Sequence, residues 1–357
     1  MDLSKIISIS NEYGNDPELV LAGGGNTSVK DNNVLYVKCS GTSLKTIDEN
    51  GFVPVSIAAL KATMTKDYPE EDKSREAAFL EDVMASRVIS GESRRPSVEA
   101  LLHSLFPQKY VVHLHPALVN GLTCVKNSEQ KTRDLFSDKA IWIPATRPGY
   151  MLGKLCYEIM EKYRMEKGRD VNLAFLENHG IFTAADTIEE IKEIFNEAMA
   201  VLKSNVKKFP DIRYAEYVSS QIGDAVEKYT SAEHVRLYTS PQLLKYLISE
   251  NAVADIMLPL TPDHIVYYGA KPLYIQNISQ LQDRYNGEKI ILIKNAGMFA
   301  VGKTEKEAEL AALLFLDAVK VVFYTKSFGK IKPLSDELVN FILNWEAEHY
   351  RQKEANS

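Results

Sequence analysis

The sequence predicts an α/β protein, and three observations lead to that fold class. Short apolar runs typical of strands, such as KYVVHLHP and VNLAFL, alternate with longer runs of helical spacing. In one helical run the apolar residues stand at 188, 191, 194, 195, 198, 201 and 202. The chain has 357 residues, 45% of them hydrophobic and 25% charged, which is enough for two domains with their own cores.

The elements follow one another in a regular order. Residues 1–60 have the pattern of short strands and turns, and helices are predicted at 70–88 and from Ser97 onwards, just after Pro96. Next come, in order, the strand KYVVHLHP, a helical stretch at 120–135, the strand IWIPA, the helix GKLCYEIMEKY and the strand VNLAFL. Thr187 and Glu190 then form a capping-box pattern, which marks the start of a further helix.

Composition excludes several classes of protein. The formal net charge is −6 and no basic run reaches five residues, so nucleic-acid binding is not expected as a main role. There is no stretch of 18 apolar residues for a membrane span, and the start MDLSKIISIS is too short and polar for a signal peptide. The three cysteines, Cys39, Cys124 and Cys156, are far apart and odd in number, which indicates packing roles in a reducing cytoplasm.

An internal repeat divides the chain. LAFLENHGIFTAADTIEEI at 173–191 and IILIKNAGMFAVGKTEKEA at 290–308 share an apolar strand, an Asn-x-Gly turn, a phenylalanine and a capping threonine. Two ordinary strand–turn–helix units could match by chance, but the shared register favours duplication. We therefore predict two domains, at 1–220 and 221–357. The second would be a smaller α/β unit, a degenerate copy of the same fold without metal ligands.

The two copies differ in chemistry. The first has His179 where the second has Ala296. A second, weaker alignment matches LTPDHIVYYGAKP to LFPQKYVVHLHP and places Tyr268 and Ala270 where the first copy has His113 and His115. On this hypothesis the C-terminal half is a structural or interface domain.

Three histidines and a glutamate form the candidate chemical site. His113 and His115 are two residues apart on a strand, so their side chains face the same way and can reach one ion. His179 ends an apolar strand beside a glycine, and Glu99 precedes the strand with the histidine pair. Each of these residues has a more ordinary interpretation when taken singly. The two strand histidines could be an exposed pair, His179 could cap a helix, and Glu99 could be a solvated carboxylate. The combination of all four residues favours a zinc site in which three histidines bind the ion and one coordination position stays open for chemistry. His103, four residues after Glu99 on the same helix face, could be a fourth ligand, but we expect it to pack behind the site or support it.

The stretch LAGGGNTSVK raises a separate question about its three consecutive glycines. It lacks a Walker pattern, and Ser28 stands where the dinucleotide fingerprint needs its third glycine. Two explanations remain open. The loop could line an anion site with backbone N–H groups, or it could be a tight entry into a hairpin that needs glycine for positive φ.

The motifs GGGNTSVK, VKCSGTSL, RPSVEALLH, VVHLHP and LENHG occur in this order over roughly residues 15–205. Together they resemble the class II aldolase/adducin family, and within it the aldolase part of rhamnulose-phosphate aldolase/dehydrogenase proteins. The resemblance implies a central, mainly antiparallel sheet flanked by helices. It also implies a zinc ion held by His113, His115 and His179, with Glu99 as catalytic acid/base.

The resemblance further implies a phosphate site, for which six residues match: Gly25, Asn26, Ser40, Gly41, Thr42 and Ser97. The family often has two serines before the glutamate, whereas this chain has Ser97-Val98-Glu99, so the phosphate could be held differently or be absent from the substrate. Arg147, in ATRPGY, could bind a phosphate or carboxylate or could be a solvated loop residue.

The function that follows is a cytoplasmic, zinc-dependent sugar-phosphate aldolase. It would cleave a ketose 1-phosphate, such as rhamnulose or fuculose 1-phosphate, to dihydroxyacetone phosphate and an aldehyde. A metal-dependent decarboxylase, dehydratase or epimerase of a sugar acid is the second hypothesis, and a non-enzymatic, adducin-like binding protein is the third. The family's tyrosine proton donor has no clear counterpart, with Tyr150 the only suggestion. Simpler members form fourfold rings, so a homo-oligomer is expected.

Overall fold

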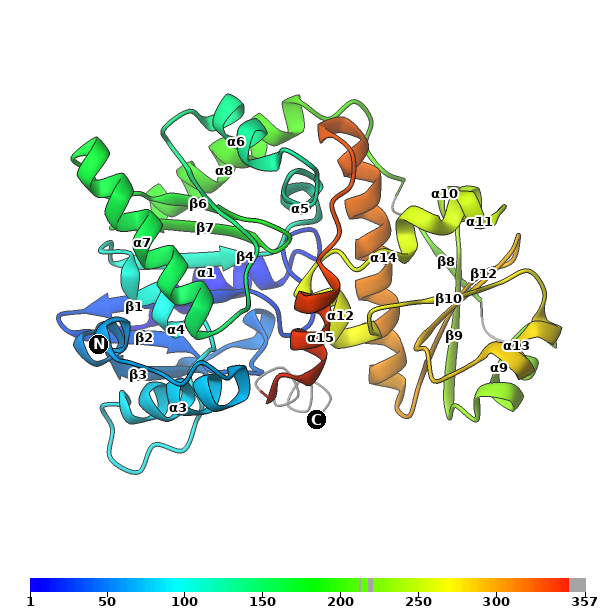
Figure 1. Cartoon of the computed structure of the whole chain (residues 1–357), viewed down its shortest axis with the longest axis horizontal. Coiled ribbons are helices and arrows are strands. Elements are labelled where there is room, and N and C mark those ends of the chain that lie inside the picture. Colours follow the sequence, from blue (N-terminus) through cyan, green and yellow to red (C-terminus); the bar gives the residue numbers. More distant parts are fainter. Residues whose placement is uncertain (212, 218–220, 347–357) are drawn as a thin grey trace.

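The computed structural model describes residues 1–211, 213–217 and 221–346 (Figure 1). Two sheets occupy the two ends of the molecule, and the long helix α14 (Glu305–Phe328) lies between them (Figure 1). The predicted domain boundary after residue 220 falls beside residues outside this description and stays a prediction.

The first sheet has seven strands in the order β3-β2-β1-β4-β7-β6-β5. The strands are β1 (Asn26–Asp31), β2 (Val34–Lys38), β3 (Phe52–Ser56), β4 (Tyr110–Leu114), β5 (Ile141–Ile143), β6 (Leu173–Leu176) and β7 (Gly180–Ala185). All neighbours pair antiparallel except β5 and β6, which are parallel. The prediction of a central, mainly antiparallel sheet is confirmed.

Helices cover both faces of this sheet because successive side chains on each strand point to opposite sides. On β4, for example, Val112 and Leu114 belong to one core and Val111 to the other. The first core is covered by α1 (Ser4–Gly14), α5 (Ala117–Thr123), α6 (Ser128–Phe136) and α8 (Ile188–Ser204). The second is covered by α2 (Ile57–Ala62), α3 (Asp72–Ala85), α4 (Ala100–Leu105) and α7 (Tyr150–Lys167).

Two predicted helices differ from the observed ones. The helix expected from Ser97 begins at Ala100. Ser97 precedes it in a turn, where its hydroxyl accepts a hydrogen bond from the Glu99 N–H. Helix 120–135 is two helices, α5 and α6, because Asn127 before α6 takes a left-handed conformation with φ of 60°. The capping box of Thr187 and Glu190 is present as predicted.

The second sheet has five strands in the order β10-β11-β12-β9-β8. They are β8 (Ala215–Tyr217), β9 (His234–Thr239), β10 (Leu273–Ile275), β11 (Ile290–Ile293) and β12 (Gly297–Gly302). The helices of this half, besides α14, are α9 (Gln221–Thr230), α10 (Pro241–Tyr246), α11 (Glu250–Val253), α12 (Pro262–Tyr268), α13 (Leu281–Arg284) and α15 (Asp336–Asn344).

The second sheet repeats the topology of part of the first. Taken in chain order, β8 to β12 occupy the places of β1, β4, β5, β6 and β7, with the same neighbours and the same strand directions. The hairpin register is also the same, since Leu176 pairs with Gly180 in the first sheet and Ile293 with Gly297 in the second. Over the described residues, the C-terminal half therefore repeats a reduced form of the first sheet, without strands in the places of β2 and β3.

The weaker repeat alignment was wrong. Residues 262–268 form helix α12, so Tyr268 and Ala270 do not stand in the places of His113 and His115. Those places belong to β9. Leu237 pairs with Phe299 as His113 pairs with Phe182, and Thr239 lies two residues further on. The Thr261 and Pro262 pair explains the helix, because the threonine hydroxyl caps it and proline fits its first turn.

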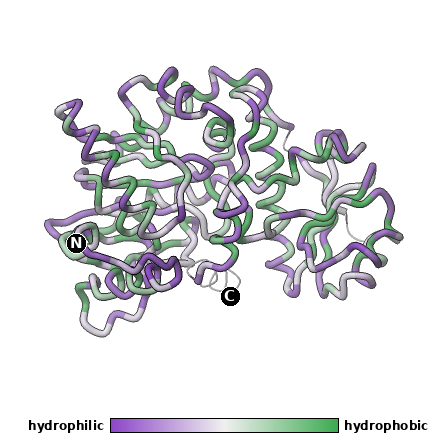
Figure 2. Tube along the Cα trace, viewed as in Figure 1, coloured by the Kyte–Doolittle hydropathy of each residue, from purple (hydrophilic) through white to green (hydrophobic). Residues whose placement is uncertain are grey.

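One hydrophobic core joins the two halves. Buried side chains of α14, among them Phe315, Val319 and Val322, belong to the same cluster as Val119 and Leu122 of α5. Figure 2 shows the hydrophobic segments running through the interior and the hydrophilic ones through the outer loops. No helix among the described residues is long and apolar enough to cross a membrane.

Candidate metal centre

Three histidines meet near the end of β4, the middle strand of the first sheet. His113 lies on β4, His115 follows the end of that strand, and His179 lies in the turn between β6 and β7. The Nε2 atom of His113 is 2.8 Å from that of His115 and 3.5 Å from that of His179. One ligand atom from each of the three lies within 4.8 Å of the others, so the group can hold a metal ion.

Hydrogen bonds on the far side of two rings decide which nitrogen faces the centre. His113 Nδ1 is 3.0 Å from the Ile181 carbonyl oxygen, and His115 Nδ1 is 2.5 Å from Asp263 Oδ2. A carbonyl and a carboxylate both accept, so each Nδ1 carries the proton in the neutral ring. Two Nε2 lone pairs then face each other at 2.8 Å, an arrangement that a shared cation stabilises.

Glu99 points at the same place from the residue before α4. Its Oε1 is 3.3 Å from His113 Nε2 and 3.5 Å from His179 Nε2, and its Oε2 accepts a hydrogen bond from the Asn26 side-chain amide. Oε1 is buried and has no hydrogen-bond partner among the described residues. A buried carboxylate oxygen aimed at three imidazoles is suited to a cation.

The electrostatics suit a metal ion as well. Burial lowers the pKa of His179 to about 3, so its imidazole is neutral, the form that coordinates metal. Burial also opposes ionisation of Glu99. Its polar contact with His113, with smaller contributions from His179 and His115, outweighs burial and holds the pKa of Glu99 well below its usual range. The residues present therefore fit a zinc ion, with three nitrogen ligands and one carboxylate oxygen available.

His103 lies behind this group. Its Nδ1 is 2.8 Å from Ser28 Oγ, and its ring lies in an edge contact with Phe182, which also stacks on the ring of His113. Burial holds the pKa of His103 well below its usual range, so the ring is neutral. It packs in the core next to the site and does not belong to the ligand group.

The segments expected to hold phosphate come together around Lys38. The backbone carbonyl of Lys38 accepts from the Ser97 N–H at 2.9 Å. Its ammonium donates to the carbonyls of Thr42 and Gly23 at 2.6 and 3.4 Å. Ser40 also donates, from its N–H, to the Arg95 carbonyl at 2.9 Å. The loops at 23–25 and 40–42 and the segment at 97–99 are thus neighbours, with a buried lysine at their junction.

The glycine run lies against the residues that support the histidines. A Cβ atom on Gly24 would stand 2.8 Å from Asp263 Oδ2 and 3.3 Å from His115 Nδ1. Gly25 has φ of +68° and lies close to the His113 carbonyl. The Gly23 N–H donates to the Tyr267 hydroxyl at 3.1 Å. The positive φ of Gly25 agrees with the explanation that the run needs glycine for its conformation, whereas the anion site stays a prediction, and the Gly23 N–H is already used by a side chain.

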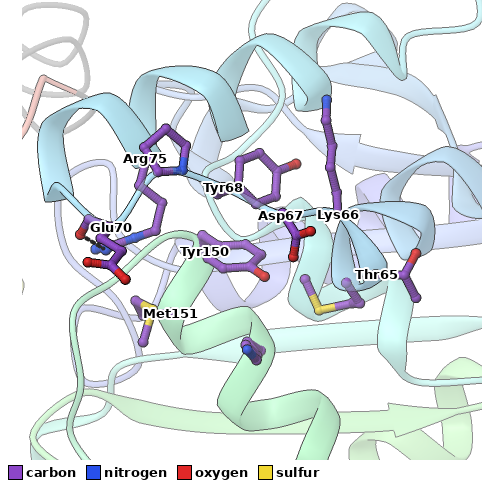
Figure 3. A pocket seen from close by; sticks show the side chains of 11 residues that line it. Thr65, Lys66, Asp67, Tyr68, Glu70, Arg75, Tyr150 and Met151 are labelled. Carbon is purple, nitrogen blue, oxygen red and sulfur yellow. Dashed lines mark hydrogen bonds between the residues drawn. The ribbon is translucent and has the colours of Figure 1, made fainter.

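Arg147 and Tyr150 are engaged elsewhere. The Arg147 guanidinium pairs with Asp72, at 3.2 Å, and with Glu337 of α15. An anionic ligand would compete with these carboxylates. The Tyr150 ring lies 4.6 Å from that of Tyr68 and lines a cavity of about 300 Å³ between the segment 64–70 and the start of α7 (Figure 3). None of the candidate metal ligands lines that cavity.

A much smaller cavity, of about 20 Å³, lies beside His179. It is lined by the loop of Pro144 to Pro148 and closed from the C-terminal half by Pro262, Leu338 and Ile342. A space of this size does not admit a sugar phosphate.

Sequence reasoning missed three residues at this site: Lys38, Asp263 and Tyr267. Lys38 had a weak local indication, because a lysine between buried positions of a strand is unusual. Asp263 lies 148 residues from His115 along the chain and Tyr267 lies 244 from Gly23. No local pattern connects such distant residues.

The family follows from comparison with known sequences. The family model described as the Class II Aldolase and Adducin N-terminal domain matches residues 4–206, more than half of the chain. The protein belongs to this family. Membership supports a function of the aldolase, epimerase or decarboxylase type.

Individual relatives are more distant. The uncharacterized oxidoreductase YuxG of Bacillus subtilis (strain 168) is 24% identical over 410 residues, which cover 98% of this chain and 58% of that protein. The chain thus spans about 58% of the length of this curated relative. An N-terminal class II aldolase domain from Thermoplasma acidophilum is 28% identical, with a TM-score of 0.49, over 57% of this chain and 93% of that one. An L-fuculose 1-phosphate aldolase is 20% identical, with a TM-score of 0.39, over 57% and 86% respectively.

Proposed function

We propose that the protein is a zinc-dependent sugar-phosphate aldolase that cleaves a ketose 1-phosphate to dihydroxyacetone phosphate and an aldehyde. The observation that carries the proposal is the convergence of three imidazole nitrogens with the buried Glu99 carboxylate. His113, His115 and His179 would hold the ion. When bound, zinc supplies Lewis-acid stabilisation for the enediolate left by cleavage next to a carbonyl.

Glu99 is the proposed acid/base. Its low pKa keeps it anionic, so it can take a proton from carbon in the condensing direction and return it in the cleaving direction. Asn26 donates to Oε2 and leaves Oε1 directed at the centre. The Asn26 amide therefore holds the carboxylate in the orientation that this proton transfer needs.

The substrate phosphate is assigned to the neighbouring loops. Ser40, Gly41, Thr42 and Ser97, together with the loop of Gly25 and Asn26, are the proposed contacts. Support comes from the junction of these segments at Lys38, whose buried ammonium favours a negative charge nearby. Binding the phosphate away from the cleaved bond would hold the substrate in register and lower the entropic barrier.

A metal-dependent decarboxylase, dehydratase or epimerase of a sugar acid is the second candidate, because the same enediolate chemistry serves these reactions. Val98 favours it, since a valine next to Ser97 offers no hydroxyl for phosphate. Arg147 could bind a substrate carboxylate if the covering α15 moved and Glu337 released it. A non-enzymatic, adducin-like protein is the third candidate. It does not explain why the chain has all three histidines, which argues against it.

The test is a coupled assay for dihydroxyacetone phosphate. Zinc-loaded protein is offered a panel of ketose 1-phosphates that includes the rhamnulose and fuculose forms, with chelator-treated protein and Glu99→Gln as controls. Release that is lost in both controls supports the aldolase. No release from protein with one bound zinc per chain refutes it and points to the sugar-acid enzymes, with Arg147→Ala as the next variant. Protein that binds no zinc, and is unaltered by His115→Ala, is the result expected of the adducin-like alternative.

A further inference from the structure

We propose that Asp263, on helix α12 of the C-terminal half, is a positioning residue for the metal ligand His115. The inference rests on the metal site of the proposed function and goes beyond its assigned residues. It makes the C-terminal half a support of the metal centre, which goes beyond the structural or interface role that the sequence predicted for it.

The contact itself is the first line of support. Asp263 Oδ2 lies 2.5 Å from His115 Nδ1, and the two side chains are 9% and 8% exposed. An acceptor-only carboxylate fixes the proton on Nδ1, so Nε2 presents its lone pair. It also holds the ring in the plane that points Nε2 at His113, 2.8 Å away. A carboxylate or a backbone carbonyl on the far nitrogen is the usual support of a ligating histidine.

The neighbouring candidate ligand, His113, is also supported by a hydrogen bond from its Nδ1, but to a different kind of acceptor. His113 uses the Ile181 carbonyl of β7, which belongs to its own sheet. His115 lies beyond the end of β4, where the sheet ladder has ended. Its acceptor therefore comes from another part of the chain, and α12 provides it.

Two hydrogen bonds hold helix α12 in place beside the site. The Leu260 carbonyl, just before the helix, accepts from the Asn178 amide at 2.9 Å. Tyr267, one turn after Asp263, accepts from the Gly23 N–H at 3.1 Å. Gly24 allows the close approach, because a Cβ there would stand 2.8 Å from Asp263 Oδ2. Asp263 and Tyr267 share one face of the helix, so both contacts are made together.

The experiment measures zinc affinity by competition with a chromophoric chelator, in full-length protein. The variants are Asp263→Asn, which keeps an acceptor but loses the charge, and Asp263→Ala, which loses both. The matched control is Asp317→Asn, because Asp317 is also buried in the C-terminal half and lies 3.1 Å from the Nε2 of a buried histidine, His264, outside the metal centre. Circular dichroism and urea unfolding check that each variant folds.

We expect Asp263→Asn to weaken zinc binding about tenfold and Asp263→Ala up to about a hundredfold, the range found for residues that support a ligand. The visible absorption of the cobalt-substituted protein should shift in both. Asp317→Asn should keep wild-type affinity and an unshifted spectrum, whatever its effect on stability.

Folded Asp263 variants with wild-type affinity and spectrum would overturn the inference. An equal loss in Asp317→Asn would overturn it too, since the effect would then come from general destabilisation. These results are independent of turnover. Wild-type protein that binds zinc but releases no product would refute the aldolase alone, and wild-type protein without zinc affinity would refute both proposals.

Discussion

The two hairpin turns at 176–180 and 293–297 have the same backbone and different chemistry. Asn178 and Asn295 have left-handed φ values of 56° and 57°. The next residue in each, His179 or Ala296, donates its N–H to the third residue before it, at 3.2 and 3.0 Å. The residue before each asparagine also makes the same hydrogen bond to the neighbouring parallel strand. The Glu177 N–H donates to the Ile143 carbonyl, and the Lys294 N–H donates to the Ile275 carbonyl.

The difference between the turns teaches that the histidine is not needed for the fold. The second copy forms the turn with alanine, and its strand β9 has Leu237 and Thr239 in the places of His113 and His115. The candidate metal ligands of the first copy thus stand on a backbone arrangement that the second copy forms without them. The second half takes part in the site from a different element, α12.

The largest effect should come from making the first turn like the second. His179→Ala removes one of three nitrogen ligands, so zinc affinity should fall at least about a hundredfold, more than for a residue that only supports a ligand. The urea midpoint should stay close to wild type because Ala296 occupies the same backbone position. Bound zinc after dialysis and an unfolding curve measure the two effects.

The reverse change is the control for that experiment. Ala296→His should not create a metal site, since Leu237 and Thr239 offer no ligands beside it. A large loss of stability in His179→Ala would show that the two turns are less alike than their hydrogen bonds indicate.

A smaller effect distinguishes the two asparagines. Asn178 is buried and its amide donates to the Leu260 and Lys332 carbonyls, both at 2.9 Å, whereas Asn295 is exposed. Glycine suits the positive φ at either position. Asn178→Gly should therefore lower the free energy of unfolding by about 2 kcal/mol more than Asn295→Gly, about 1 kcal/mol for each lost hydrogen bond. Equal urea midpoints in the two variants would contradict this account.

The smallest effect concerns pH and the buried His103 of the first half. Burial lowers its folded pKa well below 6.5, so the unfolded chain takes up a proton that the folded chain excludes. Stability should fall as the pH drops below about 6.5, and His103 should account for about 1 kcal/mol between pH 7 and 5.5. Urea unfolding of chelator-treated wild type and His103→Gln at both pH values measures it. The variant should lose less stability, and parallel losses would show that His103 is protonated in the folded protein.

Local patterns in the sequence were enough for much of this protein. The alternation of strands and helices, the capping box at Thr187 and the repeated Asn-x-Gly turn each depend on residues within a few positions, whose spacing and φ preferences act in the unfolded chain as well. The three candidate ligands and Glu99 could be proposed for the same reason. His113 and His115 share a strand face, and His179 and Glu99 each stand where a strand or helix ends or begins.

Tertiary structure alone decided which distant residues complete the site. The apolar residues of LTPDHIVYYGAKP resembled a strand, but its Thr-Pro start and its place against α14 and α15 made it helix α12. That helix brings Asp263 to His115 across 148 residues and Tyr267 to Gly23 across 244. Such pairs depend on how two sheets pack on one shared core, and the sequence of either segment contains no record of its partner.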